Sequence, residues 1–206
     1  MPSTLQLYYI TDRTQIRDGS LEDCIQKAID GGVDWVQIRE KDLSARSLLT
    51  LAQSALDYAC KRDPAHTRVI INDRLDVAWA AKAHGVHLGT RSMPAGKARS
   101  MAPAGFLLGI SCHSLEEALA AQAAGADYIL LGPVFETPSK VQYGPPLGLC
   151  KLREVTLQVS LPVFALGGIN IERISQCLEN GAAGIAGIRI FQECESLPAL
   201  VRILRI

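Results

Sequence analysis

The chain lacks the features that would direct it to a membrane or to nucleic acid. It has no run of about 18 uninterrupted apolar residues, so no segment is long enough to span a bilayer. Its start, MPSTLQLYY, lacks the basic segment and apolar run of a signal peptide. Its 21 Lys and Arg residues equal its 21 Asp and Glu residues, which leaves no bulk charge to attract nucleic acid or anionic lipid. We therefore expect a soluble, cytoplasmic protein that binds neither nucleic acid nor a membrane.

Cysteine is present, but not in the spacing of a zinc site or a redox motif. The six cysteines stand singly at Cys24, Cys60, Cys112, Cys150, Cys177 and Cys194. We expect them to be reduced and mostly packed. Cys112 has no activating partner in the sequence and is interpreted as a small core thiol.

Eight repeats of one pattern predict the fold. Short apolar or β-branched runs occupy residues 5–11, 35–39, 69–72, 85–88, 106–111, 128–132, 162–167 and 184–188. Segments of helical period lie between them at residues 21–30, 44–61, 76–82, 115–124, 171–180 and 197–204, with weaker ones at 96–101 and 149–157. Strand then helix, repeated eight times, predicts an α/β protein with a single (β/α)₈ barrel over residues 1–206. An open doubly wound sheet is the alternative, but the first strand is not followed by GxGxxG.

Polar residues gather where the predicted strands end. Chemistry in a barrel of this kind is carried by the C-terminal ends of its strands. Seven of the eight predicted strands run into polar or glycine-rich segments, at residues 11–13, 39–41, 72–74, 111–114, 132–140, 167–170 and 189. The joints from helix to strand carry mostly Gly, Ala and Val. We therefore expect a functional pocket at the C-terminal rim of the strands.

The segment VQIREK, residues 36–41, carries the strongest signal. In an extended chain Gln37, Arg39 and Lys41 point to one side. Cations on the inner face of a strand require an anion, because burying each of them without a partner costs several kcal/mol. The alternative is a solvated turn after an edge strand, formed by Arg39, Glu40 and Lys41. The polar ends of the other strands favour the anion site.

Further residues suit the binding of two or more phosphate groups. Lys140 and Arg189 add cations, and the segment GGIN at 167–170 adds backbone amides where barrels often hold phosphate. Asn72 and Asp73 offer oxygen ligands suited to a Mg²⁺ ion that bridges phosphates. Asp73 could instead cap the helix that follows it.

Three other polar side chains have both a functional and a structural interpretation. The hydroxyls of Thr137 and Ser139 can donate to a phosphate or cap a turn. His113, at the end of the fifth strand, suits a general base, although a lone histidine is more often structural.

The chain resembles the thiamine phosphate synthase and TenI-like family from the first strand to the last. The matching segments are YYITDR, GGVDWVQIREKD, VIINDRLDVA, GVHLG, GISCHSLEEA, GADYILLGPVFETPSK and FALGGIN. Members are small (β/α)₈ barrels, and the synthase joins an aminopyrimidine methyl diphosphate to a thiazole ethyl phosphate, with magnesium and release of pyrophosphate. The resemblance therefore implies a Mg²⁺-dependent transferase that makes thiamine phosphate from small phosphorylated substrates.

The resemblance also implies roles for individual residues. The residues that fall where the synthase holds the pyrimidine diphosphate are Gln37, Arg39, Lys41, Asn72, Ser111 and Lys140, and Arg39, Lys41, Ser111 and Lys140 are the implied catalytic residues. Asp73 falls on a magnesium ligand. The residues that fall at the thiazole phosphate are Thr137, Ser139, Gly168, Ile188 and Arg189.

Two departures from the family pattern leave alternatives open. Ser92 stands where synthases usually carry a second magnesium-binding aspartate, and Arg189 stands where they usually carry a serine. The first alternative is a TenI-like thiazole tautomerase, in which His113 would transfer the proton on a thiazole carboxylate phosphate. A non-catalytic protein that binds a phosphate ligand is the second. The sequence leaves the oligomeric state open, a homo-oligomer included, and it leaves the magnesium affinity open.

Overall fold

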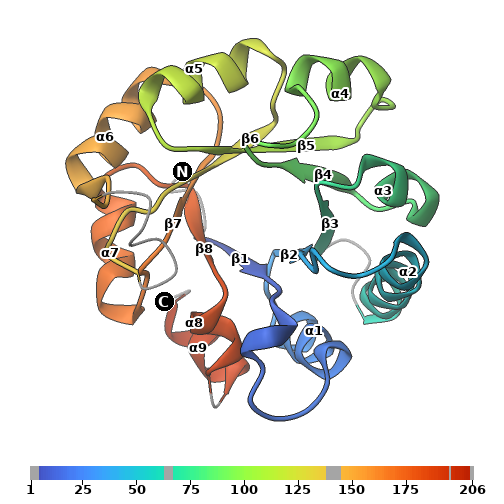
Figure 1. Cartoon of the computed structure of the whole chain (residues 1–206). Helices are drawn as coiled ribbons and strands as arrows, with labels where there is room; N and C mark the ends of the chain where they lie inside the picture. Colours follow the sequence, from blue (N-terminus) through green and yellow to red (C-terminus); the bar gives the residue numbers. More distant parts are fainter. Residues whose placement is uncertain (1–4, 63–66, 138–144, 195, 205–206) are drawn as a thin grey trace. The chain divides into compact units, whose positions relative to one another are not determined.

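In the computed structural model, which describes residues 5–62, 67–137, 145–194 and 196–204, strands and helices alternate along the chain. The strands are β1 (Gln6–Ile10), β2 (Trp35–Ile38), β3 (Arg68–Asn72), β4 (Gly85–Leu88), β5 (Leu107–Cys112), β6 (Tyr128–Leu131), β7 (Val163–Leu166) and β8 (Gly184–Gly187). They follow one another in chain order in a closed barrel (Figure 1). The predicted (β/α)₈ fold is confirmed.

The helices also follow the predicted order, with two additions. They are α1 (Leu21–Asp30), α2 (Ala45–Arg62), α3 (Leu75–Ala81), α4 (Ala95–Met101), α5 (Leu115–Ala123), α6 (Gly148–Gln158), α7 (Ile171–Glu179), α8 (Arg189–Gln192) and α9 (Leu197–Leu204), with a 3₁₀ turn, η1, at Arg13–Gln15. The sequence predicted neither η1 nor α8. Each is three or four residues long, which is too short for a helical period to appear in the pattern of apolar residues.

Side-chain caps fix where several helices begin. Ser20, Ser114 and Asn170 are the N-caps of α1, α5 and α7, and each side-chain oxygen accepts a backbone N–H from the first turn. At α1 the cap is reciprocal, because the Asp23 carboxylate accepts the N–H of Ser20 in return. Such caps satisfy amides that have no partner within the helix. They set the lengths of the loops that precede these helices.

The chain divides into two compact units. The β1–β3 unit consists of Gln6–Val86 and Ile188–Ile206, and the β5–β8 unit consists mainly of His87–Gly187. The boundary between them falls within β4. The expectation of one domain over residues 1–206 therefore stays a prediction, and the two units are described separately below.

In the β1–β3 unit the strand register explains which residues share the face of Gln37. Strands β1, β2 and β3 pair in parallel, with Tyr8 opposite Trp35 and Trp35 opposite Arg68. Tyr8 stacks on Trp35 with ring centroids 5.5 Å apart, and the Arg68 guanidinium lies 4.7 Å from the Trp35 ring centroid. Gln37 lies two residues beyond Trp35 and therefore points to the same face. This alternation brings Gln37 to the C-terminal end of β2 as a buried polar residue.

In the β5–β8 unit a glycine makes room for a large aromatic ring. Gly109 lies opposite Tyr128, and a Cβ atom at Gly109 would meet the Tyr128 ring at 2.1 Å. Tyr128 in turn packs against Phe164 and His87, at centroid distances of 5.8 and 5.7 Å. The buried aromatic cluster lies below Ser111, which is two residues beyond Gly109 on β5.

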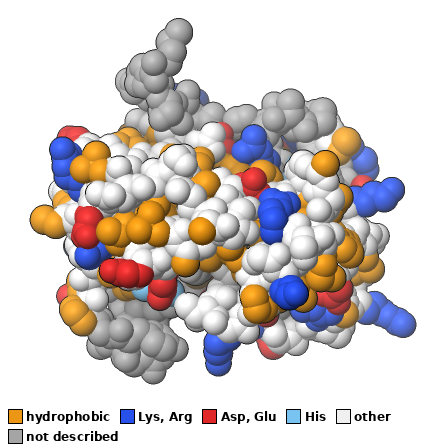
Figure 2. All heavy atoms as spheres, turned by 90° about the horizontal axis from the view of Figure 1, so that it is seen from above, with side chains coloured by type: hydrophobic (Ala, Val, Ile, Leu, Met, Phe, Trp, Pro, Cys, Tyr) orange, Lys and Arg blue, Asp and Glu red, His pale blue; other side chains and the backbone are white. Residues whose placement is uncertain are grey.

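The surface mixes charges of both signs. On the face shown in Figure 2, Lys and Arg side chains lie among acidic and hydrophobic side chains, as the equal numbers of basic and acidic residues lead one to expect. None of the helices in the described ranges has both the length and the apolar character that crossing a membrane requires.

Candidate active site

Gln37 and Asn72 end neighbouring strands and are hydrogen bonded to each other. The Gln37 side-chain nitrogen donates to the Asn72 side-chain oxygen over 2.9 Å. Gln37 is 1% exposed, and its side-chain oxygen has no hydrogen-bond partner among the described residues. An unsatisfied buried acceptor costs about 1–3 kcal/mol. The pair therefore leaves one buried acceptor unsatisfied at the end of β2.

Arg39 and Lys41 both follow the end of β2. The strand ends at Ile38, and Lys41 is exposed in a turn that the Leu43 amide closes by donating to the Glu40 carbonyl over 3.3 Å. The predicted extended segment therefore ends before Arg39 and Lys41, and the strand does not fix the side on which either side chain lies. Arg39 is partly buried.

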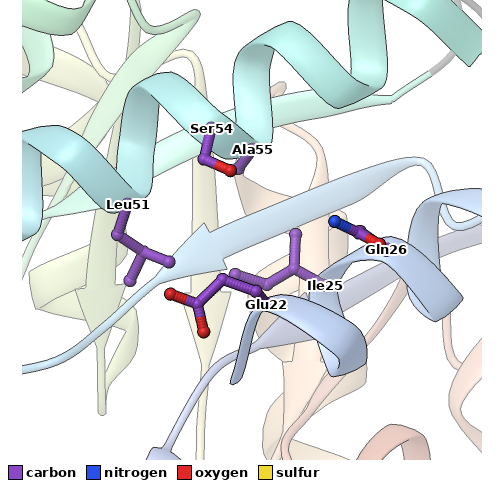
Figure 3. Close-up of a pocket in the computed structure, with 6 residues that line it drawn as sticks. All are labelled: Glu22, Ile25, Gln26, Leu51, Ser54 and Ala55. Carbon is purple, nitrogen blue, oxygen red and sulfur yellow. The ribbon is translucent and has the colours of Figure 1, made fainter. Parts of the chain in front are cut away.

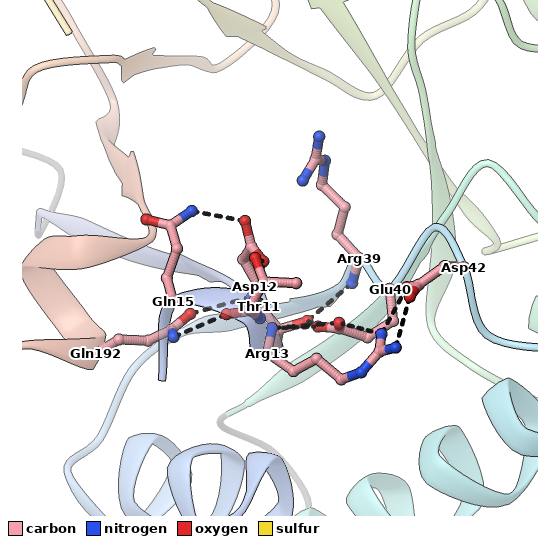
Figure 4. Close-up of polar contacts among 9 residues, drawn as sticks. Thr11, Asp12, Arg13, Gln15, Arg39, Glu40, Asp42 and Gln192 are labelled. Atoms are coloured by element: carbon pink, nitrogen blue, oxygen red, sulfur yellow. Dashed lines mark hydrogen bonds and ion pairs between the residues drawn. The ribbon is translucent and has the colours of Figure 1, made fainter. Parts of the chain in front are cut away.

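A network of polar contacts surrounds the base of Arg39. It joins residues that follow β1 and β2 with one residue of α8: Thr11, Asp12, Arg13, Gln15, Arg39, Glu40, Asp42 and Gln192 (Figure 4). In this view the Arg39 guanidinium extends away from the other labelled side chains. Asp12 lies near that charge. Burial raises the pKa of Asp12, but hydrogen bonds from Thr14 and Gln15 and the positive charge of Arg39 outweigh burial and hold the pKa below its ordinary value.

Gln192 connects the loop after β1 to the helix that carries Arg189. Its side-chain oxygen accepts the Asp12 N–H over 3.1 Å, and its side-chain nitrogen donates to the Asp12 carbonyl over 3.0 Å. Ile188 is the N-cap of α8, and Arg189, its first residue, is exposed. The sequence pattern placed Ile188 at the end of a strand, whereas β8 stops at Gly187. Arg189 thus projects from a short helix fastened to the loop after β1.

Asp73 has an unusual backbone conformation and does not cap α3. Its φ angle is +65°, in the left-handed region that non-glycine residues rarely occupy. The N-cap of α3 is Arg74, and no side chain caps this helix. The interpretation of Asp73 as a helix cap is therefore wrong. A strained backbone of this kind costs about 1–3 kcal/mol and is often kept at functional positions.

In the β5–β8 unit, Ser111 is held by a buried histidine. The Ser111 hydroxyl and His87 Nε2 lie 2.9 Å apart, and His87 is 2% exposed. His87 stands within the apolar strand β4, where the sequence alone suggests no functional role. The contact between His87 of β4 and Ser111 of β5 appears only in the folded chain.

His113 and Cys112 have contacts of different kinds. The Glu117 carboxylate accepts the His113 backbone N–H over 2.7 Å and lies 3.1 Å from His113 Nδ1. A carboxylate at one ring nitrogen orients the imidazole, which suits either a structural or a proton-transferring role. Cys112 is buried, and burial, with the nearby Glu117 charge, raises the pKa of its thiol to about 12. The interpretation of Cys112 as a core thiol is confirmed.

The structure joins the loops that follow β6 and β7. The Val134 and Phe135 amides donate to the Leu166 and Gly167 carbonyls over 2.8 and 3.1 Å. Arg173, in the first turn of α7, donates to the Gly168 carbonyl over 2.7 Å, and its guanidinium lies 4.7 Å from the Phe135 ring centroid. These contacts bring two of the predicted thiazole-phosphate residues, Thr137 and Gly168, into adjoining loops of one unit.

Gly168 is a position that only glycine can occupy without disturbance. Its φ angle is +64°, and a Cβ atom there would meet the Glu136 carbonyl oxygen at 2.5 Å and the Phe135 Cβ at 2.8 Å. The backbone of the GGIN segment therefore approaches the loop after β6 more closely than any side chain would allow.

The remaining predicted residues fall in two groups. Ser92 closes its own turn, because its hydroxyl accepts the Gly89 N–H over 2.8 Å. Ser139 and Lys140 lie outside the described residues.

The described residues contain no complete metal-binding site made of protein side chains alone. No group of three or more His, Cys, Asp or Glu side chains among them is arranged to hold a metal ion. Mg²⁺ in phosphate-transfer sites is commonly held by one or two carboxylates, with substrate phosphates supplying further oxygens. The exposed Asp73 carboxylate, at its strained turn, fits a site of that kind.

One small pocket lies away from these strand ends. It is lined by Glu22, Ile25, Gln26, Leu51, Ser54 and Ala55 of α1 and α2 (Figure 3). Its volume of ≈ 10 Å³ holds about one water molecule. It is too small for a phosphorylated substrate.

Several functional candidates were missed from the sequence. Thr11, Glu40 and Gln192 join the network around Arg39, His87 contacts Ser111, and Arg173 contacts Gly168. Thr11 and Glu40 carried a usable signal, because both follow strands that the predicted barrel makes neighbours. Gln192 carried none, since its partner Asp12 lies 180 residues away in the sequence, and Arg173 carried none, since it lies within a predicted helix.

Comparison with known proteins places the chain among enzymes of thiamine synthesis. The family model described as thiamine monophosphate synthase matches residues 7–191. A putative thiamine-phosphate synthase of Geobacter sulfurreducens is 49% identical over 180 residues, which cover 87% of this chain and 83% of that protein. The thiamine-phosphate synthase of Clostridium novyi is 40% identical over 188 residues, 91% of each chain. The solved structure of a thiamine phosphate pyrophosphorylase from Pyrococcus furiosus superposes with a TM-score of 0.86 at 33% identity, over 98% of this chain and 96% of that one.

Proposed function

Since this chain belongs to the thiamine monophosphate synthase family, we propose that it is a thiamine-phosphate synthase, a transferase of thiamine biosynthesis. Its substrates are two small phosphorylated molecules, an aminopyrimidine methyl diphosphate and a thiazole ethyl phosphate. The products are thiamine phosphate and pyrophosphate. The cytoplasmic location and the oligomeric state stay predictions.

The observation that carries the proposal is the buried Gln37 oxygen. It lies at the C-terminal end of β2 and has no hydrogen-bond partner among the described residues, while the nitrogen of the same amide is engaged with Asn72. The amino group of an aminopyrimidine is a donor of the kind that this oxygen requires. Binding it would remove the desolvation cost of the unsatisfied acceptor, about 1–3 kcal/mol.

The cations that follow β2 suit the diphosphate of the same substrate. Arg39 can form bidentate hydrogen bonds to phosphate oxygens, and Lys41 supplies a point charge. On the family pattern, the pyrimidine diphosphate is bound by Gln37, Arg39, Lys41, Asn72, Ser111 and Lys140, of which Arg39, Lys41, Ser111 and Lys140 serve the chemical step. The buried contact from His87 supports the Ser111 assignment, because it fixes where the hydroxyl lies.

The second substrate requires a site for one phosphate. On the family pattern its residues are Thr137, Ser139, Gly168, Ile188 and Arg189. The close approach of the loops after β6 and β7 supports the assignment of Thr137 and Gly168, since backbone amides and hydroxyls are common phosphate ligands. Arg189 adds a full cation where the family usually carries serine.

Magnesium fits this scheme through Asp73. Its exposed carboxylate would hold Mg²⁺, and a bound Mg²⁺ ion supplies positive charge to the diphosphate oxygens. With Ser92 in place of the second aspartate, the protein contributes one carboxylate fewer than is usual, so substrate oxygens and water must complete the coordination.

The reaction needs positioning and charge rather than a covalent enzyme intermediate. The bond between the pyrimidine methylene carbon and the diphosphate oxygen breaks, and its electron pair leaves with pyrophosphate. The thiazole nitrogen then donates its lone pair to the methylene cation. Arg39, Lys41 and Lys140 stabilise the negative charge that develops on the leaving group. Removing one such preorganised contact slows an enzyme by about 100- to 1000-fold.

One observation favours a second candidate, thiazole tautomerase. His113 contacts the Glu117 carboxylate through both its backbone N–H and its ring, an arrangement suited to a proton-transferring imidazole. The missing magnesium carboxylate at Ser92 agrees with that activity. Retention of the diphosphate residues Arg39, Lys41, Asn72 and Asp73 favours the synthase, because a tautomerase has no diphosphate to bind.

Two parallel incubations of the purified protein separate the synthase from the tautomerase. Purified protein is given both phosphorylated substrates and Mg²⁺, and thiamine phosphate is measured; the thiazole carboxylate phosphate is offered in a parallel tube. We expect thiamine phosphate in the first tube, with Lys41→Ala and Lys140→Ala abolishing it while leaving the fold intact. Tautomerisation alone, lost in His113→Ala, would support the second candidate. Ligand binding with no turnover of any substrate would indicate a sensor.

A further inference from the structure

Glu40 is a buried carboxylate, and in the sequence it stands between Arg39 and Lys41, the two cations that we assign to the diphosphate. Its side chain is 2% exposed. A buried carboxylate is retained only where hydrogen bonds and an opposite charge offset its lost hydration. Neither substrate binding nor the chemical step described above assigns Glu40 a role.

The partners of Glu40 come from the loop after β1. The Thr11 hydroxyl donates to one carboxylate oxygen over 2.6 Å. The Arg13 backbone N–H lies 3.3 and 3.2 Å from the two oxygens, and the Arg13 guanidinium lies 3.3 Å from one of them (Figure 4). The carboxylate is thus bound to three donors that all belong to the segment following β1.

Asp42 holds Arg13 in place as the counter-ion of Glu40. The two terminal nitrogens of Arg13 each donate to one oxygen of the Asp42 carboxylate over 2.6 Å. A bidentate pair of this kind fixes the orientation of the guanidinium plane as well as its position. Arg13 therefore lies between two carboxylates, and its single charge offsets part of the charge of Glu40 from the β1 side.

The Thr11 hydroxyl transmits this anchor to Arg39. Thr11 is fully buried, and because its hydroxyl proton is donated to Glu40, its oxygen lone pairs accept the Arg39 backbone N–H over 2.9 Å. The Thr11 backbone N–H donates to the Gln37 carbonyl over 2.9 Å. Thr11 is therefore hydrogen bonded to the residues on both sides of Ile38, the last residue of β2. One of these bonds is to the backbone of Arg39 itself.

We propose that Glu40 and Thr11 are positioning residues for diphosphate binding, with Thr11 as the hydrogen-bonding link through which the buried carboxylate fixes the backbone of Arg39. The inference rests on the proposed function and deepens it. The ligand class is a diphosphate group, either in the substrate or as free pyrophosphate. Glu40 and Thr11 themselves touch no substrate; they determine where the Arg39 guanidinium begins.

The test compares two substitutions of Thr11. Thr11→Val keeps the shape of the side chain and removes the hydroxyl, whereas Thr11→Ser keeps the hydroxyl and removes a methyl group. The affinity of each protein for inorganic pyrophosphate with Mg²⁺ is measured by titration calorimetry, together with kcat and KM for the diphosphate substrate. We expect Thr11→Val to weaken pyrophosphate binding by about tenfold, because the hydrogen bond that orients the Arg39 backbone is lost. We expect the pyrophosphate affinity of Thr11→Ser to stay within about threefold of that of the parent.

The readouts distinguish positioning from simple stability. Thermal unfolding is followed for each variant, and binding is measured well below each midpoint. Lower midpoints with equal pyrophosphate affinity and equal kcat/KM in Thr11→Val and Thr11→Ser would overturn the inference. Glu40→Met, which keeps an unbranched side chain of similar length but removes the acceptor for the Thr11 hydroxyl, gives the same comparison if Thr11→Val does not fold. Parent-like pyrophosphate affinity in Glu40→Met would overturn the inference equally.

Failure of the inference and failure of the proposed function give different results. If the parent protein makes thiamine phosphate and Thr11→Val binds pyrophosphate normally, only the inference is wrong. If the parent makes no thiamine phosphate, the proposed function is wrong, and the pyrophosphate titrations still decide whether Thr11 positions Arg39.

Discussion

The segments that follow the strands are held by side-chain contacts in the β1–β3 unit and mainly by backbone contacts after β6 and β7 in the β5–β8 unit. In the β1–β3 unit they are held by ionised and amide side chains, with Glu40, Arg13 and Asp42 in one chain of contacts and Gln192 on Asp12. In the β5–β8 unit the loops after β6 and β7 are held mainly through backbone atoms, and Gly168 allows an approach that no side chain would permit.

The difference matches the two ligands that we propose. A diphosphate that leaves during the reaction carries growing negative charge, and fixed cations stabilise that charge most strongly. A phosphate that only anchors its substrate needs constant binding, which backbone amides and hydroxyls supply. The comparison therefore predicts that substitutions of the cations that follow β2 lower kcat, whereas backbone changes in the loop after β7 raise the KM for the thiazole phosphate.

Among the substitutions that compare the loops after β2 and β7, removal of the Arg39 guanidinium should have the largest effect. We expect Arg39→Ala to lower kcat by about 100- to 1000-fold, because the charge of the leaving group loses a preorganised partner. The rate of thiamine phosphate formation at saturating substrate measures it. Arg62→Ala is the matched control: Arg62 pairs with Asp30 in a largely exposed contact of 2.7 Å, and it should leave kcat unchanged. Equal losses in both variants would dismiss a specific role for Arg39.

A methyl group at Gly168 should act on the other substrate. In Gly168→Ala the new Cβ must move the loop after β6, and the positive φ angle, which glycine adopts freely, becomes strained. We expect the KM for the thiazole phosphate to rise about tenfold, with a loss of stability of about 1–3 kcal/mol. Gly96→Ala is the control, because a Cβ there meets nothing within 4 Å. A tenfold loss of kcat with unchanged KM would contradict the assignment of Gly168 to the thiazole phosphate.

The change Ser92→Asp should have a smaller effect. It restores the carboxylate that the family usually carries, and we expect a several-fold lower Mg²⁺ concentration for half-maximal activity. Titration of activity with Mg²⁺ measures it, with Ser92→Asn as the uncharged control. Superimposable titrations of the parent and Ser92→Asp would show that the missing aspartate does not explain the metal affinity.

The smallest expected effect is on the pH dependence of stability. Burial lowers the pKa of His84 below its ordinary value of 6.5, and its Nδ1 accepts the Val69 N–H over 3.0 Å. Because the unfolded chain binds a proton more readily at this residue, stability is fully present above about pH 6.5 and is lost as the pH falls through the lowered folded-state pKa. Denaturant unfolding at a series of pH values should show this loss, and His84→Gln should flatten it. An identical slope in both proteins would exclude His84.

The fold could be predicted because each element is long enough to show its period. Helices α1 and α9 and strand β4 have the predicted bounds, and the ends of the other predicted elements differ by at most one residue. Helix α8, with four residues, shows no period, so Arg189 was expected at the end of a strand. Lys41 was assigned to the face of Gln37 by continuing an alternation that the backbone ends at Ile38.

The candidate site was only partly predictable, for a physical reason. Residue types and their positions after strands indicated Gln37, Arg39, Asn72 and Asp73, because parallel strands end together. The role of Glu40 depends on contacts with Thr11 and Arg13, which are 29 and 27 residues away. Side-chain directions in loops follow from such contacts and not from a sequence period.

The most direct measurement follows thiamine phosphate and pyrophosphate in the same reaction, for the parent protein and for Arg39→Ala. We predict that the parent forms both products in equal amounts and at the same rate, and that Arg39→Ala slows both together by about 100-fold or more. Formation of neither product by the parent, or of both at the parental rate by Arg39→Ala, would contradict the account.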